Sequence, residues 1–491
     1  MDTGYLRSLK HSLLGDPAGR LVLVCNFEAE DRWACHHVGL PNPGFAAASN
    51  VVRRMEELGV LLAGADDLLI CKYPLDPGYR GYLDRIGLPV PEIAVPENVA
   101  PSRSTTEDVL DSPALLARLA ALGAAGARLL PMATTDLEQK LAESCGLPLA
   151  VPDAAVFERV NGKIYGRRLT ASAGLRVVPG DECETCDELA AVLDRRRPAL
   201  AAGQRIVVKD AYGVSGKGLL VLDGPVKADR LLRMIRRRAE RTGDDRLHVV
   251  VEEWLPKRYD LNYQVTVARD GEVRLDFVKR ALTDGGVHQG HVMPAGLTDA
   301  QHAEIDHAAR LVGARLRDDG YTGVVGVDAI VDLDDVVYPV LEINARLNMS
   351  TYQGSLTELC QAPGQVALAR HYPLTLTAAV PFAEFDRTIA TLVDPAGSDR
   401  VIVTCFGTVN ADAAQPPPFN GRLYALLVAA DPVRLAALDD AVRTALAGRF
   451  TATDPSTGSQ AATGRSGTGQ PAVTELSRTA SRSATTPEVS P

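Results

Sequence analysis

Apolar and polar positions along the first third of the chain follow the pattern of successive strands and helices. Short apolar runs at residues 21–27 and 68–74 predict buried strands, whereas residues 46–58 and the Ala- and Leu-rich stretch at 114–127 predict helices. Strands that alternate with helices usually form a parallel sheet covered by helices. Residues 1–155 are therefore predicted to form an α/β domain with a parallel sheet.

The pattern changes at about residue 156, where strands punctuated by Lys and Gly begin and run to about residue 374. Residues 375–450 contain two apolar strands followed by a helical stretch, which predicts a small C-terminal α/β domain. Residues 451–491 have no aromatic residue and are rich in Ser, Thr, Gly and Pro, so they cannot bury enough apolar surface to fold. We predict that they form a disordered tail.

Composition excludes several classes of protein. The chain has 491 residues, of which 46% are hydrophobic and 23% charged, as in soluble globular proteins. No apolar run approaches the roughly 20 residues that cross a bilayer, and the first residues lack the apolar stretch of an export signal, so we expect a cytoplasmic protein. The net charge of -10 argues against nucleic acid as the main ligand. The eight cysteines are expected to be reduced thiols.

A glycine-rich loop between two strands is the first candidate for chemistry. In RIVVKDAYGVSGKGLLVLDG, a β-branched strand ends at Lys209 and the loop that follows leads into a second strand. A Walker loop is excluded because Ala211 replaces its first glycine, and a dinucleotide fingerprint is excluded because no helix follows. The order of motifs also differs from that of protein kinases. A flap whose backbone N–H groups approach phosphate remains, beside the alternative of an ordinary hairpin.

A strand junction at residues 252–254 is the second candidate. The apolar strand ends at Glu252, Glu253 and Trp254 before another strand begins, which exposes backbone groups that can bind an adenine edge. Asp260 then lies where it could accept hydrogen bonds from ribose hydroxyls. The alternative is a solvated acidic turn.

A predicted hairpin at residues 323–346, turning near Asp334 and Asp335, carries the decisive signal. Strand alternation assigns one face to apolar residues, namely Val325, Val327, Ala329, Val331, Val337, Leu341 and Ile343. The other face collects Asp328, Glu342, Asn344 and Arg346. Opposed carboxylates repel each other unless a cation lies between them, and two carboxylates with an amide suit Mg²⁺. A merely solvated strand face is the alternative.

These segments together resemble the ATP-grasp superfamily over roughly residues 156–374. The resemblance implies that Lys163 and Lys209 bind phosphate, and that Asp260 binds ribose. It implies a phosphate flap formed by Gly213, Ser215, Gly216, Lys217 and Gly218, and an adenine-contacting segment formed by Glu252, Glu253, Trp254 and Leu255. It implies magnesium ligands at Asp328, Glu342 and Asn344, with Arg346 and Arg280 as the arginines that stabilise the phosphate and the tetrahedral intermediate.

The first third, followed by residues 128–148 and the Lys163 motif, resembles the pre-ATP-grasp domain of pheganomycin-type peptide ligases. This resemblance implies an enzyme that uses ATP and Mg²⁺, with Mn²⁺ as an alternative, to join a small-molecule carboxylate to an amino acid or peptide amine. The fold it implies is a parallel-sheet domain followed by an α+β ATP-grasp domain. A homodimer is left open.

Two other functions are kept as alternatives, namely a small-molecule kinase on the same fold and a nucleotide-binding regulatory protein without turnover. His288 and His291 lie in a Gly-rich segment, which is more typical of surface residues than of a substrate site.

Overall fold

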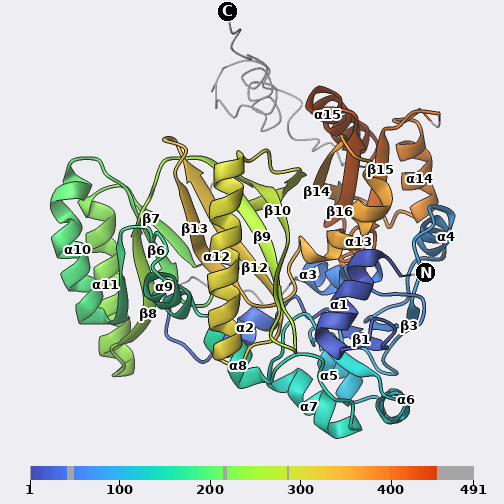
Figure 1. Ribbon diagram of the computed structural model, residues 1–491, viewed down its shortest axis with the longest axis horizontal. Helices are drawn as coiled ribbons and strands as arrows, with labels where there is room; N and C mark the ends of the chain where they lie inside the picture. The colour runs from blue at the N-terminus through green and yellow to red at the C-terminus, as the bar shows by residue number, and fades with distance from the viewer. Residues whose placement is uncertain (1, 41–48, 214–217, 285–286, 395, 451–491) are drawn as a thin grey trace, which may run out of the picture.

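The computed structural model describes residues 2–40, 49–213, 218–284, 287–394 and 396–450. In Figure 1, the N-terminal third forms one end of the molecule and the lobe with α10 and α11 forms the other, with the longest sheet between them. The predicted tail at residues 451–491 lies outside the described residues. No helix of the described part of the chain is both long and apolar enough to cross a membrane.

A four-stranded parallel sheet forms the core of the N-terminal third, as predicted. Its strand order is β3-β2-β1-β4, with every neighbouring pair parallel. All four residues of β1 are buried, because helices cover both faces of the sheet. The strands are β1 (Leu21–Val24), β2 (Leu68–Ile70), β3 (Glu92–Ala94) and β4 (Arg128–Pro131). The helices are α1 (Gly4–Leu14), α2 (Ala29–Ala34), α3 (Asn50–Arg54), η1 (Met55–Leu61), α4 (Pro77–Arg85), α5 (Thr105–Leu110), α6 (Pro113–Ala124) and α7 (Asp136–Cys145).

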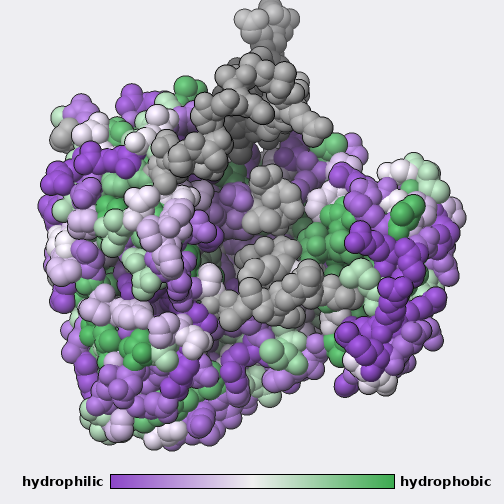
Figure 2. Space-filling model, turned by 180° about the vertical axis from the view of Figure 1, so that it is seen from behind, coloured by the Kyte–Doolittle hydropathy of each residue, from purple (hydrophilic) through white to green (hydrophobic). Residues whose placement is uncertain are grey.

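An antiparallel sheet with the order β5-β8-β6-β7 forms the small lobe at the other end of the molecule. Helices α10 and α11 pack their apolar residues against this sheet, and the arginines of α11 stay near the solvent. In Figure 2, seen from the opposite side, this lobe stands apart from the body and the surface between them is hollowed. The elements are α8 (Ala154–Val160), α9 (Lys163–Ser172), β5 (Gly180–Thr185), α10 (Cys186–Ala201), β6 (Ile206–Asp210), β7 (Leu219–Leu222), α11 (Pro225–Thr242) and β8 (Arg246–Glu253).

An eight-stranded sheet, in the order β13-β12-β9-β10-β11-β14-β16-β15, joins the rest of the chain. Helix α12 lies along one face of this sheet and buries Ile305, Val312 and Leu316. The strands are β9 (Lys257–Val267), β10 (Val273–Asp284), β11 (Val287–Met293), β12 (Gly323–Asp332), β13 (Val337–Asn344), β14 (Val366–Leu376), β15 (Arg400–Cys405) and β16 (Phe419–Ala429). The helices are α12 (Asp299–Asp318), η2 (Thr351–Gln353), α13 (Gly354–Cys360), α14 (Phe382–Ala390) and α15 (Pro432–Phe450).

The last strands of the chain share a hydrophobic core with the N-terminal third. Residues of β1, η1 and α4 belong to the same buried cluster as residues of β14, β15 and β16. The carboxylate of Glu57, in η1, accepts hydrogen bonds from the backbone N–H groups of Phe406 and Gly407 at 2.5 and 2.8 Å. Segments more than 300 residues apart are therefore held together by both apolar and polar contacts.

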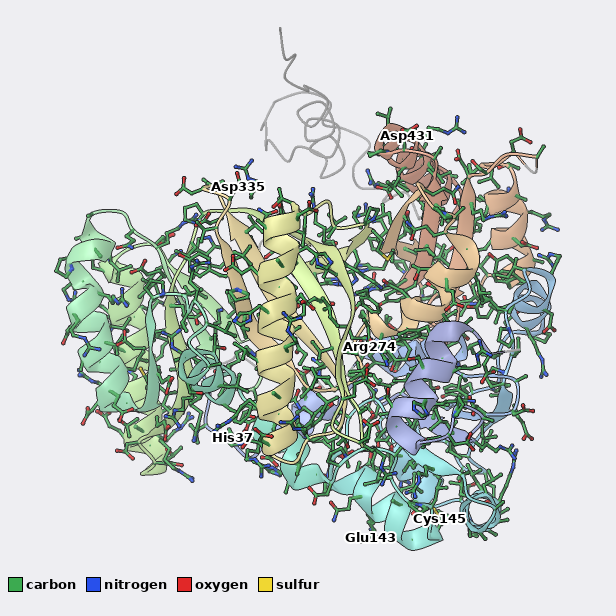
Figure 3. The ribbon with its side chains drawn as sticks, in the orientation of Figure 1. His37, Glu143, Cys145, Arg274, Asp335 and Asp431 are labelled. Atoms are coloured by element: carbon green, nitrogen blue, oxygen red, sulfur yellow. The ribbon has the colours of Figure 1, made fainter. Side chains whose placement is uncertain are left out.

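The predicted hairpin forms between β12 and β13, and Asp335 lies at its turn with a positive φ of 63°. Figure 3 labels Asp335 at the tip of the hairpin. The register shifts between Asp328, opposite Glu342, and Ile330, opposite Tyr338, so β13 bulges there. As a result Val340 enters the apolar core, while Leu341 lines the cavity described below. The prediction that Leu341 belongs to the core face is wrong, because simple alternation does not survive a bulge.

Candidate functional site

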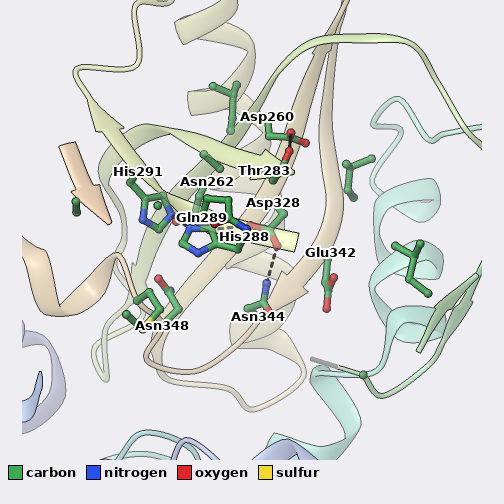
Figure 4. Close-up of a pocket in the computed structure, with 18 of the residues that line it drawn as sticks. Asp260, Asn262, Thr283, His288, Gln289, His291, Asp328, Glu342, Asn344 and Asn348 are labelled. Carbon is green, nitrogen blue, oxygen red and sulfur yellow. Dashed lines mark hydrogen bonds between the residues drawn. The ribbon is translucent and has the colours of Figure 1, made fainter. Parts of the chain in front are cut away.

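A cavity of about 640 Å³ lies where the small lobe, the long sheet and the N-terminal third meet. Residues from the loop after β8 line one end, and residues of β14, β16 and η1 line the other. The hairpin of β12 and β13 lies between these ends and contributes Asp328, Glu342 and Asn344 (Figure 4).

The acidic centre of the cavity consists of Asp328 and Glu342, which are opposite each other on neighbouring strands. Asp328 accepts hydrogen bonds from the side-chain amides of Asn262, at 2.8 Å, and Asn344, at 3.1 Å. Burial, reinforced by the charge of Glu342, raises the pKa of Asp328 to about 7. Two carboxylates and amide oxygens arranged in this way are the hard oxygen ligands that a divalent cation such as Mg²⁺ prefers. The residues present therefore fit a magnesium ion.

Two lysines approach this centre from the small lobe. Lys163 is the first residue of α9, and its Nζ lies 2.8 Å from Oε1 of Glu342 and donates to the carbonyl of Gly213 at 3.0 Å. Lys209, on β6, lies 2.6 Å from Oε2 of Glu252. Lysine ammonium groups beside an acidic centre can hold the anionic oxygens of a phosphate chain. Gly213 and Gly218 line the cavity, whereas Ser215, Gly216 and Lys217 lie outside the described residues.

The junction between β8 and β9 forms the wall next to the lysines. Glu252, Glu253, Trp254 and Leu255 all line the cavity. The side chain of Glu252 is held by Lys209 and by Arg167, whose Nη1 lies 2.8 Å from Oε1, and Glu253 pairs with Arg196 at 2.8 Å. Because these carboxylates already have cationic partners, the groups left to meet a ligand here belong mainly to the backbone and to Leu255.

Asp260 also lines the cavity, on β9, and has two partners of its own. Its carboxylate accepts a hydrogen bond from the hydroxyl of Thr283 at 2.6 Å and lies 2.6 Å from Nζ of Lys257. Lys257 therefore neutralises the carboxylate predicted to bind ribose. Figure 4 shows Asp260 and Thr283 together, beside the acidic centre.

The two predicted arginines lie in different environments. Arg346 lines the cavity, donates to Oδ1 of Asn344 at 2.9 Å and forms an ion pair with Glu30 of α2. Burial lowers its pKa to about 10. Arg280 does not line the cavity: its guanidinium lies 4.3 Å from the ring centroid of Tyr259, and its Nε donates to the carbonyl of Ala295. The alternation of β10 turns Arg280 to the face covered by α12, outside the residues that line the cavity, and its role at the phosphate stays a prediction.

His288 and His291 lie inside the cavity, with their Nε2 atoms 3.2 Å apart (Figure 4). The side chain of His291 is 3% exposed, so the expectation of surface histidines is wrong. Burial lowers the pKa of His288 to about 4. Both lie on β11, and the register of its pairing with β10 shifts between His288 and Gly290, which lets two residues three positions apart face the same side.

Sequence reasoning missed several residues that hold this site together. Asn262 contacts Asp328, Arg167 holds Glu252, and Glu30 holds Arg346. Asn262 had a detectable signal, because Asp260, Asn262 and Gln264 are polar at every second position of an otherwise apolar strand, which marks a polar strand face. Glu30 and Arg167 had no such signal, since their partners are far away along the chain.

Two family models match consecutive parts of the chain. The pre-ATP-grasp domain model matches residues 55–147, and the model of the ATP-binding domain of the carbamoyl-phosphate synthase L chain matches residues 163–374. A [butirosin acyl-carrier protein]–L-glutamate ligase of Niallia circulans is 32% identical over 208 residues, which cover 42% of this chain and 48% of that protein. A formate-dependent phosphoribosylglycinamide formyltransferase of Mycolicibacterium vanbaalenii is 29% identical over 216 residues, which cover 42% and 49%. The chain thus spans about half the length of the curated relatives it matches.

Solved structures share the fold over most of the chain. An N5-carboxyaminoimidazole ribonucleotide synthetase in complex with ADP superposes with a TM-score of 0.51 at 11% identity, covering 86% of this chain and 96% of that one. Biotin carboxylase from Campylobacter jejuni has a TM-score of 0.51 at 13% identity, covering 88% and 97%. The two matched models, and the sheets that they cover, confirm the resemblance predicted from the sequence. The chain belongs to the ATP-grasp superfamily, with a pre-ATP-grasp domain in front of its ATP-grasp domain.

Proposed function

We propose that this protein is an ATP-dependent carboxylate–amine ligase that forms an amide bond through an acyl phosphate. One observation carries the proposal. Lys163 pairs with Glu342, Glu342 lies opposite Asp328 on the neighbouring strand, and all three line the same cavity as Lys209. The relative in Niallia circulans is named as a ligase that joins L-glutamate to an acyl-carrier protein, which supports a ligase over other ATP-dependent reactions of this fold.

The reaction has two steps, phosphorylation of the carboxylate and attack by the amine. A carboxylate oxygen of the first substrate attacks the γ-phosphorus of ATP, the bond to the β-phosphate oxygen breaks, and ADP leaves. The amine nitrogen of the second substrate then attacks the acyl carbon, loses a proton and expels inorganic phosphate. The first step brings two anions together, and unit charges about 4 Å apart repel by roughly 4 kcal/mol at an effective dielectric constant of 20.

The residues of the chain would offset this repulsion. Lys163 and Lys209 bind the phosphate oxygens, the backbone of residues 253–255 receives the adenine, and Arg346 stabilises the oxyanion that forms when the amine attacks. Mg²⁺, held by Asp328, Glu342 and Asn344, would supply positive charge to the phosphates. The assignment of Asp260 to ribose requires its carboxylate to exchange Lys257 or Thr283 for the sugar.

The domain division belongs to the same proposal. We place a pre-ATP-grasp domain at residues 1–155, an ATP-grasp domain at 156–374 and a small C-terminal domain at 375–450. The strand β14 (Val366–Leu376) crosses the second of these boundaries and pairs with β11 on one side and β16 on the other. Arg422 and Tyr424 of β16 line the cavity, so the C-terminal unit contributes directly to its wall.

Trapping with hydroxylamine tests the reaction type. The protein is incubated with Mg-ATP and a panel of amino acids and small carboxylic acids, and hydroxamate and ADP are measured. A ligase gives hydroxamate with its carboxylate substrate and an amide when an amine is added, whereas a kinase that makes a stable phosphate ester gives ADP without hydroxamate. Glu342→Gln should abolish both products, and Asp334→Asn, at the exposed turn, should leave them unchanged. Full turnover by Glu342→Gln contradicts the proposal.

A further inference from the structure

The end of the cavity opposite the lysines contains an arginine that the reaction above does not use. Arg422 lies on β16, lines the cavity and is half-buried. Its Nη1 donates to the hydroxyl of Tyr424 at 3.0 Å, and Tyr424 lies opposite His371 of β14. Arg422 and Tyr424 are two residues apart on one strand, so both side chains point to the same face of the sheet.

Arg422 differs from the other arginine of this wall in its charge partners. Arg370 lies 2.7 Å from the buried carboxylate of Asp439, which balances its charge. Among the residues that the structure describes, no carboxylate lies within ion-pair distance of Arg422. A guanidinium removed from bulk water without a counter-ion is unfavourable, and its planar fork matches a carboxylate. The wall therefore presents a site for an anionic group.

Apolar residues continue from this arginine along the N-terminal side of the cavity. The hydroxyl of Tyr424 contacts the sulfur of Met55 at 3.3 Å, and Phe27 and Tyr352 have ring centroids 5.5 Å apart. Val52 and Met349 line the same part and are half-buried. A ligand whose carboxylate meets Arg422 would therefore lay an apolar group against these side chains.

A row of histidines connects this end of the cavity to the acidic centre. The ring of His371 lies 5.6 Å from that of Tyr424, and its pKa is lowered to about 4 by burial and by the charge of Arg422. His288 lines the same cavity as His371 and Asp260. The cavity is thus continuous, with one end suited to the triphosphate and the other to a second molecule.

We propose that Arg422 binds the carboxylate of the amine substrate, and that Phe27, Val52 and Met55 select an amino acid or peptide residue with an apolar side chain. The inference rests on the proposed function, because only a ligase needs a second organic substrate here. The reacting carboxylate must reach the phosphates near Asp328. A carboxylate at the far end is therefore one that is not consumed, and an amino acid or peptide carries such a group beside its amine.

Equilibrium binding tests this site without requiring turnover. L-Leucine, L-leucinamide and glycine are titrated calorimetrically into the full chain in the presence of Mg-ADP. We expect leucine to bind at least about 10-fold more tightly than leucinamide, because a charged hydrogen bond is lost in the amide, and more tightly than glycine. In Arg422→Gln the affinity for leucine should fall about 10- to 100-fold to that of leucinamide, and Arg422→Lys should be intermediate.

The matched control is Arg434→Gln, which changes an exposed arginine on α15 that pairs with Asp399. It should bind leucine like the unmodified protein, and unchanged binding of Mg-ADP shows that each variant is folded. Equal affinity of the unmodified protein and Arg422→Gln for leucine overturns the proposal, as does an unmodified protein that binds leucine no better than leucinamide. Failure of the proposed function is seen separately, as absence of hydroxamate and ADP.

Discussion

The two ends of the cavity are built in different ways. At the nucleotide end, charged side chains pair with one another: Lys163 with Glu342, Lys209 with Glu252, and Lys257 with Asp260. At the far end, the hydroxyl of Tyr424 is the only polar side-chain partner of Arg422 among the described residues, and the surrounding apolar residues come from the N-terminal third and from the last strands. The first end is held in shape by its own ion pairs, whereas the second is shaped by packing and leaves its charge to a ligand.

This comparison predicts where substitutions act. Residues of the nucleotide end hold both the local network and the phosphates, so their loss should affect every step that uses ATP. Residues of the far end should affect only the second substrate.

Removing a lysine of the nucleotide end should give the largest loss. Lys163→Met leaves Glu342 without its cation and removes a donor to the phosphates. We expect kcat/KM for ATP to fall about 100- to 1000-fold, in the range seen when one group that stabilises developing charge is removed. Steady-state ADP release measures the effect. Lys227→Met, which removes an exposed lysine of α11 paired with Asp223, is the control and should have normal activity. A loss in kcat/KM smaller than 10-fold would contradict the proposal that Lys163 binds the phosphates of ATP.

The ion pair between Glu30 and Arg346 connects the N-terminal third to the reaction centre, and Glu30 is a positioning residue. Glu30→Gln should lower kcat about 10-fold while KM for ATP changes little, because Arg346 would keep its place less firmly after losing a charged partner. The pH profile of kcat should keep its shape, since Gln removes a charge without adding a titrating group. Glu143→Gln, at the exposed residue of α7 labelled in Figure 3, is the matched control. A fall in kcat that is explained by a smaller folded fraction, seen as a lowered midpoint of thermal unfolding, would indicate a merely structural role.

The bulge in β13 places Val340 in the apolar core and its neighbour Leu341 in the cavity. Val340→Ala should lower the free energy of unfolding by about 1–3 kcal/mol with little effect on KM, since Val340 is 6% exposed and packs in the apolar core. Leu341→Ala should do the reverse and change KM for ATP or carboxylate with a smaller loss of stability. Denaturant titration and initial rates measure the two effects. If Leu341→Ala instead lowers stability and Val340→Ala changes KM, then Leu341 belongs to the core face as strict alternation predicts, and the bulge is contradicted.

Glu56, away from the cavity, should show the smallest effect, one on stability alone. Burial raises its pKa to about 7 from an ordinary 4.5, so the folded state holds a proton that the unfolded state releases between these values. Stability therefore falls as pH rises through this window, and is regained at lower pH. Glu56→Gln should remove this loss. The difference in the midpoint of thermal unfolding between the variant and the unmodified protein should therefore be more favourable to the variant at pH 8 than at pH 5, by on the order of 1–2 °C. An identical pH dependence of both proteins would contradict the raised pKa.

Much of the nucleotide end could be read from short stretches of sequence. The turn at Asp335, the polar face with Asp328, Glu342 and Asn344, and the strand before Lys209 are all local features. They follow from the two-residue period of a strand and from the glycines next to it. The same rule failed at Leu341, because the bulge shifts the period. The role predicted for Arg280 came from a motif match, which says nothing about the strand face on which a residue lies, and Arg280 packs beside Tyr259.

The sequence by itself determined the parallel sheet of the N-terminal third, the strands that follow it and the acidic hairpin, because each depends on neighbours along the chain. Only the tertiary structure decided that Glu30 meets Arg346, that the histidines turn inward and that Arg422 joins Met55 in one wall. Residues hundreds of positions apart are brought together when the last strands pack against the N-terminal core. That packing is driven by the burial of apolar surface. Because this effect is non-directional, the sequence does not show which distant apolar segments pack together.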